Sequence, residues 1–239
     1  MIELNKIYNQ DCLEGMKLID DNSIDLIVTD PPYLIKNTTA GGKSKLSKSI
    51  QGMNTKLEKA QNLTEGITEK HLAEMLRVMK NINIYIWCNH KQIPQYLDFF
   101  VKTNGSNFDI LIWNKTNPVP LFCNKYMTDK EYCLYFRKGG YCNPTGYEEA
   151  KTVYYQPINT AEKNMYPHPT KKPINIITNI VKNSSKVGET ILDPFIGSGT
   201  TAVPCIKNER KFIGFEIEKK YFKVANNRIE DELSQIKLF

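Results

Sequence analysis

The run Thr29–Tyr33 (TDPPY) has the residue types of a reaction site. It follows a short apolar segment, Ile24–Val28, that predicts a buried strand. Two consecutive prolines lack backbone donors, hold φ near about −65° and disfavour the helical conformation at Asp30. The run predicts a rigid platform with a carboxylate, carbonyls and an aromatic ring at a strand end, where open α/β sheets bind ligands. A plain turn is the alternative, because Asp-Pro also starts turns.

A second candidate is the glycine loop Asp193–Thr201, which lies between an apolar run and a helical stretch. Its Gly-Ser-Gly turn can present backbone amides and a helix N-terminus to a ligand. Glu216 follows at the end of the next expected strand, at the spacing of an acidic residue that holds ribose hydroxyls. The loop lacks the third glycine of a GxGxxG motif, which argues against a dinucleotide oxidoreductase.

Strands and helices are expected to alternate around these residues. Short runs rich in Ile, Val and Tyr predict strands at Lys6–Gln10, Ile24–Thr29, Ile82–Cys88, Phe108–Asn114, Tyr132–Arg137, Glu189–Asp193 and Lys211–Ile217. Helices are expected after Thr68, after the glycine loop, from Pro173 and from about Lys219. This alternation predicts an α/β sheet covered by helices on both faces.

The composition predicts one soluble domain over residues 1–239. Of these residues 41% are apolar and 24% charged, enough for a core and too apolar for a disordered chain. No apolar run approaches the about 18 residues of a membrane span, and the N-terminus lacks the layout of a secretory signal. The 6 cysteines form no CxxC pair, so neither a metal site nor a disulfide framework is expected. We therefore expect a cytoplasmic protein.

Positive charge is concentrated in one segment of a chain whose net charge is +6. Residues 37–66 are polar, rich in lysine and without periodicity, which suits a polyanionic partner or, alternatively, a solvated loop. Residues 139–167, rich in Tyr, Asn, Pro and Gly, also predict irregular structure. Segments this long are usually functional or mobile.

Taken together, the motifs resemble the β-class amino-methyltransferases of DNA, which methylate exocyclic amines with S-adenosylmethionine. The resemblance covers nearly the whole chain, in the circularly permuted order that places the catalytic tetrapeptide before the glycine loop. It implies a Rossmann-like class I methyltransferase fold with a mostly parallel seven-stranded sheet and one antiparallel strand. The implied partner is double-stranded DNA.

The resemblance also assigns roles to individual residues. The catalytic motif is Asp30, Pro31, Pro32 and Tyr33, with Tyr33 stacking on a flipped base. Asn9–Leu13 looks like the element that contacts the adenine of the cofactor, although Gln10 stands where the family usually has Gly. His168–Pro173 resembles the HPTxKP cofactor-binding segment. The implied cofactor-binding residues are Asp11, Cys12, Asp30, Thr170, Lys172, Pro173, Asp193, Pro194, Phe195, Gly197, Ser198, Gly199, Thr200, Thr201 and Glu216.

DNA contacts are expected in the basic loop 37–66 and beside Trp113. Trp113 and Lys115 resemble the family's segment beside the target base, with a core role as the alternative for Trp113. Residues 139–167 are the candidate target-recognition insert. Because this insert is short, a second copy of the chain or a specificity subunit is considered as a partner, together with a cognate restriction enzyme. The expected DNA-binding residues are Lys36, Lys43, Lys45, Lys48, Trp113 and Lys115.

The sequence leaves several hypotheses about the activity open. Asp30 favours adenine N6 as the acceptor, because family members that act on cytosine N4 tend to carry Ser at this position. Methylation of cytosine N4 is the first alternative, and a non-catalytic DNA-binding or specificity partner with the same fold is the second. An RNA or protein amide methyltransferase is the third; those enzymes often carry Asn at the head of the tetrapeptide.

Overall fold

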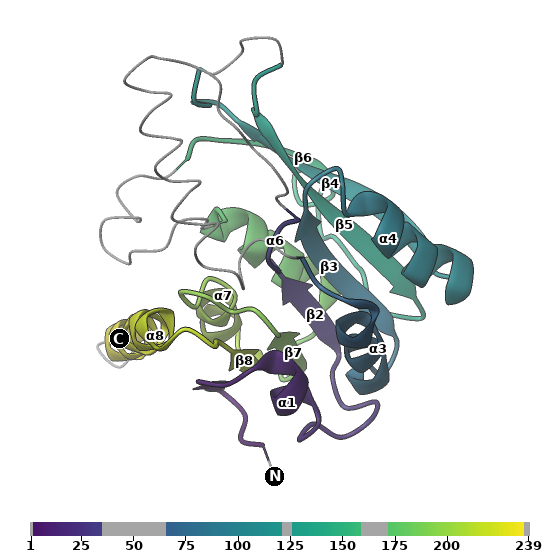
Figure 1. Cartoon of the computed structure of the whole chain (residues 1–239). Helices are drawn as coiled ribbons and strands as arrows, with labels where there is room; N and C mark the ends of the chain where they lie inside the picture. The colour runs from purple at the N-terminus through teal and green to yellow at the C-terminus, as the bar shows by residue number, and fades with distance from the viewer. Residues whose placement is uncertain (1, 35–65, 121–125, 159–171, 237–239) are drawn as a thin grey trace, which may run out of the picture.

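A computed structural model describes residues 2–34, 66–120, 126–158 and 172–236, and their strands form one eight-stranded sheet (Figure 1). Across the sheet the strand order is β1-β8-β7-β2-β3-β5-β4-β6. The strands are β1 (Lys6–Tyr8), β2 (Leu26–Thr29), β3 (Ile82–Cys88), β4 (Asn107–Lys115), β5 (Lys130–Lys138), β6 (Val153–Gln156), β7 (Thr190–Asp193) and β8 (Lys211–Phe215).

One strand, β5, runs antiparallel to both of its neighbours, β3 and β4, and every other pair in the sheet is parallel. The single antiparallel strand is therefore confirmed, whereas the expected count of seven strands is wrong. The additional strand is β6, inside the segment expected to be irregular. It pairs with β4 at the sheet edge and has only 4 residues, too few for a clear alternating pattern.

Helices cover both faces of the sheet, as predicted (Figure 1). One face carries α1 (Cys12–Met16), α3 (Glu69–Val78) and α4 (Ile93–Leu97), which continues as the π-helix η2 (Asp98–Thr103). The other face carries α6 (Ile174–Ser184), α7 (Ala202–Lys207) and α8 (Lys219–Ile236). None of the helices in the described ranges is both long and apolar enough to span a membrane.

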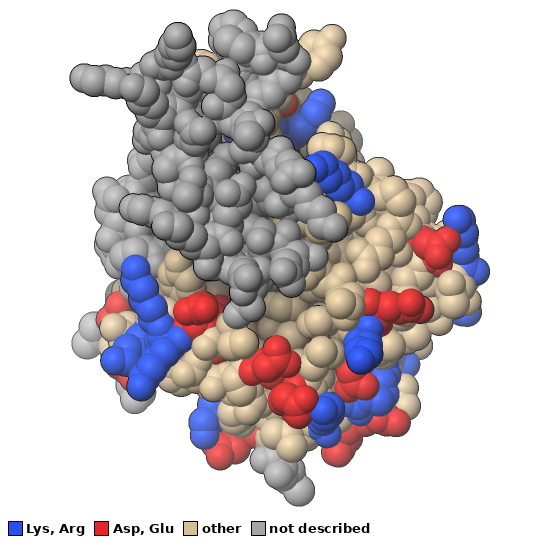
Figure 2. Space-filling model, in the orientation of Figure 1, with Lys and Arg blue, Asp and Glu red and all other residues tan. Residues whose placement is uncertain are grey.

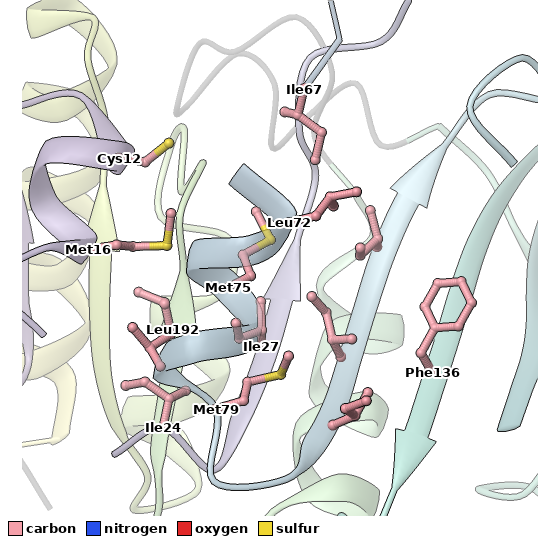
Figure 3. Close-up of a cluster of buried hydrophobic side chains, with 14 of the residues drawn as sticks. Cys12, Met16, Ile24, Ile27, Ile67, Leu72, Met75, Met79, Phe136 and Leu192 are labelled. Atoms are coloured by element: carbon pink, nitrogen blue, oxygen red, sulfur yellow. The ribbon is translucent and has the colours of Figure 1, made fainter. Parts of the chain in front are cut away.

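The central strand β3 joins two hydrophobic cores, because it is buried along its whole length. Its even-numbered residues pack with α1 and α3, while Tyr85 and Trp87 pack with α6 and α7. Figure 3 shows the first core, in which Leu72 and Met75 of α3 lie over Ile27 of β2. This packing fixes the end of β2, where the TDPPY run begins.

The helix starts expected at Thr68, Pro173 and Lys219 are confirmed within a residue. Thr68 precedes α3, and its backbone N–H donates to Nδ1 of His71 at 3.2 Å, which satisfies one exposed donor of the first turn. The sequence did not predict α1 and α4, because segments of 5 residues are too short to show a helical period.

Candidate active site

Four adjacent parallel strands, β1, β8, β7 and β2, end at the same edge of the sheet. The segments that follow them line one cavity of about 400 Å³. Fifteen of the predicted residues lie in its wall: Asp11, Cys12, Asp30, Pro31, Pro32, Tyr33, Lys172, Asp193, Pro194, Phe195, Gly197, Ser198, Thr200, Thr201 and Glu216. The topology thus brings together motifs that are up to 205 positions apart in the chain.

Asp193 shapes the glycine loop from within. Its Oδ1 accepts a hydrogen bond from the backbone N–H of Phe195 at 3.1 Å, and its Oδ2 accepts one from Oγ1 of Thr201 at 2.6 Å. Burial raises the pKa of Asp193 to about 7. Gly197 and Gly199 have φ of +55° and +77°, a region that other residues rarely adopt. Gly199 lies outside the cavity wall but gives the loop its shape.

Beside the glycine loop, the ends of β1 and β8 are joined by Asn9, whose Nδ2 donates to the carbonyls of Glu216 at 2.8 Å and Ile217 at 3.0 Å. Both strands stop here, two residues earlier than predicted, as the chain turns into the cavity. Burial raises the pKa of the Glu216 carboxyl to about 6. A carboxyl group at this edge can accept hydrogen bonds from a pair of ligand hydroxyls.

Asp30 lies directly after β2 with its two oxygens in different surroundings. Oδ2 accepts a hydrogen bond from Nζ of Lys172 at 2.5 Å, whereas Oδ1 is buried without a hydrogen-bond partner among the described residues. Burial raises the pKa of Asp30 and the Lys172 ammonium opposes that shift. Gln92 anchors the TDPPY run, because its Nε2 donates a hydrogen bond to the Pro32 carbonyl at 3.1 Å.

Glu131 of β5 contacts this site and was not found from the sequence. Its Oε1 lies 2.7 Å from Nζ of Lys115, and its Oε2 lies 3.1 Å from Nζ of Lys172. Burial alone would raise the pKa of Glu131, but the two ammonium groups outweigh it and lower the pKa to about 2. No spacing rule predicts these pairs, since they arise from strand register and from the start of α6.

Two of the expected DNA contacts are directed inward. Trp113 is buried, and its Nε1 donates to the carbonyl of Gln156 at 2.8 Å, so the core alternative holds for this residue. The Lys115 side chain is 11% exposed and paired with Glu131. Pro173 is buried as the N-cap of α6, outside the cavity wall. Lys36, Lys43, Lys45, Lys48, Thr170 and His168 lie outside the described residues.

The cavity wall also contains residues that the sequence did not assign to the site. The motifs mark the ends of strands, but side chains that carry no motif come from β3 and α6, and from α3 and α8 together with the two residues before each of these helices. These residues include Ile67, Thr68, His71, Trp87, Ile177, Ile217, Glu218 and Tyr221.

The sheet order, its single antiparallel strand and the cavity at its carboxyl edge define a Rossmann-like class I methyltransferase. A family model described as DNA methylase matches residues 24–227, and the chain belongs to this family of N6 and N4 methylases. The chain is 28% identical to the type II methyltransferase M2.MboI of Moraxella bovis over 94% of this chain and 87% of that protein.

Two further comparisons agree with this assignment. The type II methyltransferase M2.DpnII of Streptococcus pneumoniae is 30% identical to the chain, covering 95% of this chain and 90% of that protein. A crystal structure of the M1.HpyAVI–SAM complex superposes with a TM-score of 0.67 at 26% identity, covering 94% of this chain and 98% of that chain.

S-adenosylmethionine is the methyl donor of the family, and the cavity fits it. Five buried polar atoms of wall residues have no hydrogen-bond partner within the described ranges: Gln10 Nε2, Thr29 Oγ1, Asp30 Oδ1, Trp87 Nε1 and Ser198 Oγ. Unpartnered buried polar atoms are costly unless a ligand satisfies them. With the apolar ring of Phe195 and the carboxyl of Glu216, they suit a ligand that is part aromatic, part hydroxylated and part charged.

Proposed function

We propose that this DNA methyltransferase transfers the methyl group to the exocyclic N6 of an adenine flipped out of double-stranded DNA. The observation that carries the proposal is the state of Asp30: one oxygen is held by Lys172, and the other is buried in the cavity wall without a partner among the residues that the structure describes. A target base needs such an acceptor, because the lone pair of its amine is delocalised into the ring.

S-adenosylmethionine, when bound, supplies a methyl group that its positively charged sulfonium activates. We assign its binding to the segment Gln10–Cys12, to the glycine loop and to Glu216, all of which line the cavity. Lys172 lines the same cavity, but its contacts with Asp30 and Glu131 favour a role beside the transferring group.

Asp30 Oδ1 and the Pro31 carbonyl are proposed to accept the two hydrogens of the target amine and to direct its lone pair at the methyl group. In-line displacement then depends on positioning rather than on a covalent nucleophile. Tyr33 is proposed to stack on the flipped base, a contact worth about 1–3 kcal/mol. Asp30 at the head of the tetrapeptide favours adenine over cytosine as the target.

DNA binding is assigned to Lys36 and to Lys43, Lys45 and Lys48 of the basic loop 37–66, which would neutralise phosphates. Where Figure 2 shows the described surface, acidic and basic side chains are interspersed rather than gathered by sign. We assign base reading to the insert 139–167. Its described part is attached to α6 through Asn179 and Asn183, which donate to the Glu149 carbonyl at 2.9 and 2.7 Å.

Within this proposal the chain is a single cytoplasmic methyltransferase domain over residues 1–239. A second copy or a specificity subunit would supplement the short insert. A cognate restriction enzyme is proposed because M2.MboI and M2.DpnII are type II methyltransferases.

The decisive experiment is methyl transfer to unmethylated duplex DNA, with the product nucleosides identified by mass spectrometry and Asp30→Ala as the control. N6-methyladenine formed by the wild type alone supports the proposal. N4-methylcytosine would overturn the choice of base and keep the reaction. No modified nucleoside, despite measurable cofactor binding, would favour a non-catalytic partner or another substrate.

A further inference from the structure

We infer that Glu131 is a positioning residue of the methyl-transfer site, which holds Lys172 and Tyr33 so that one oxygen of Asp30 stays available to the target amine. The inference rests on the proposed function insofar as Asp30 is the acceptor. Glu131 belongs to none of the motifs and lies on the antiparallel strand β5.

Four side chains of alternating charge form a chain through the site: Lys115, Glu131, Lys172 and Asp30. The distances between successive charged atoms are 2.7, 3.1 and 2.5 Å. They come from β4, β5, the residue before the N-cap of α6 and the end of β2. Two positive and two negative charges balance, so no net charge is buried.

Lys172 is the least exposed of the four, at 4% of its side chain. Its Nζ lies 5.2 Å from the ring centroids of Tyr33 and of Trp87, so two rings flank the ammonium that two carboxylates bind. An ammonium has three donors and no acceptor. Because Glu131 takes one donor, Lys172 need not direct all of them at Asp30. Without Glu131, Asp30 would be the one carboxylate among the described residues that pairs with Lys172.

The same oxygen of Glu131 also holds the aromatic ring of the motif. The hydroxyl of Tyr33 donates to Oε2 at 3.3 Å, and this atom also binds Lys172. The ring proposed to stack on the base and the ammonium beside Asp30 therefore share one acceptor atom. Lys115 binds Oε1 and fixes the carboxylate from its other side.

The inference predicts the direction in which the pKa of Asp30 shifts when Glu131 loses its charge. Glu131 raises the pKa of Asp30, and Lys172 lowers it. Among the described residues, the charged or titratable groups that interact with Asp30 from the surrounding elements are Lys172, Glu131, Tyr33, Cys88, Tyr96, Cys133 and Asp193. Replacing Glu131 by the isosteric Gln removes one negative charge, so Asp30 is expected to titrate at lower pH.

The first test is kinetic and compares Glu131→Gln with wild type under single turnover at saturating cofactor and DNA. We expect the transfer rate to fall at least tenfold, while the Kd values for S-adenosylmethionine and for DNA change by less than twofold. Glu131→Asp is expected to recover part of the rate. Glu3→Gln, which removes a carboxylate from the exposed pair with Lys6, is the matched control and should leave the rate unchanged. A wild-type rate in Glu131→Gln would overturn the inference, as would a loss confined to cofactor affinity.

The second test does not depend on catalysis. The ¹³C carboxyl resonance of Asp30, assigned with Asp30→Asn, should titrate at lower pH in Glu131→Gln than in wild type. An unchanged titration in a folded variant overturns the inference, whichever base the enzyme methylates. If wild type forms no methylated base but the titration shifts, the proposed function fails and the coupling of Glu131 to Asp30 stands.

Discussion

Nζ of Lys172 lies 2.5 Å from Oδ2 of Asp30, and this contact joins the start of α6 to the end of β2. The pair divides the carboxylate into one oxygen that is bound and one, Oδ1, that is buried without a partner in the described part of the chain. Burial alone would lower the pKa of Lys172, but Asp30 and Glu131 outweigh it and raise the pKa, so the lysine stays charged. The site therefore keeps a fixed cation beside the carboxylate that we propose as the acceptor for the target amine.

Asp30→Ala removes the acceptor while leaving the cofactor-binding loop intact. We expect transfer to fall by about 10²-fold or more, the range for losing one preorganised group at a reacting centre. The Kd for S-adenosylmethionine should change little, since the glycine loop and Glu216 lie on other strands. Single-turnover kinetics measure the transfer rate, and calorimetric titration measures the Kd for S-adenosylmethionine. A variant that still transfers at the wild-type rate would remove Asp30 from the mechanism.

The strand ends and their motifs could be predicted from the sequence because each depends on local chemistry. The prolines after Asp30 and the glycines of the loop fix backbone conformation within a few residues, and the apolar runs before them predict buried strands. The parallel order then brings Asp30, Asp193 and Glu216 to one edge without further information. Local pattern was sufficient for this part of the site.

Glu131 could not be predicted in this way. It is 98 positions from Tyr33, and its contacts depend on the register that places it opposite Trp113. Lys115 illustrates the same limit: its place in a segment that resembles the family's segment beside the target base predicts a DNA contact, but its pairing with Glu131 depends on strand register. Strand β6 was missed for another reason: an edge strand of 4 residues buries too little to leave a pattern.

Burial of Asp193 predicts that stability depends on pH. Its folded-state pKa is about 7, above the ordinary value of 3.8, so folding favours the protonated form. The stability from this group is fully present below the ordinary pKa and is lost as pH rises through about 7. Asp193→Asn, which stays neutral, should lack this loss. The free energy of unfolding, measured from pH 4 to 8, should fall more steeply in wild type than in Asp193→Asn; parallel curves would contradict the assignment.

Gly199→Ala tests the conformation of the glycine loop. With φ of +77°, an added Cβ is expected to cost about 1–2 kcal/mol. Gly188→Ala is the matched control, since Gly188 has φ of +80° and no described residue lies within 4 Å of an added Cβ. Both variants should lose similar stability in denaturant unfolding, but Gly199→Ala alone should bind S-adenosylmethionine more weakly. Equal affinity of the two variants for S-adenosylmethionine would show that the backbone conformation at Gly199 is not needed for cofactor binding.

Replacing Lys43, Lys45 and Lys48 together by Ala is expected to weaken DNA binding. Each lost phosphate contact flattens the slope of log K against log salt by about 0.9. The control is Lys102→Ala, whose exposed side chain lies in η2, before the start of β4 and away from the cavity edge. Fluorescence anisotropy at several salt concentrations measures the slope. A slope unchanged in the triple variant would leave the lysines as a solvated segment without phosphate contacts.

Gln10→Leu should change stability and cofactor affinity in opposite directions. Within the described ranges, the Nε2 atom of Gln10 is buried without a partner, although the residue lines the cavity beside Asp11 and Cys12. Leucine keeps similar volume and removes the unpaired donor, so the cofactor-free protein should unfold at a higher temperature. If the amide donates to bound S-adenosylmethionine, its loss should weaken binding by about tenfold. Calorimetry and thermal unfolding of the same preparation measure both effects, and a more stable variant with unaltered affinity would show that the amide faces the cavity without contacting the cofactor.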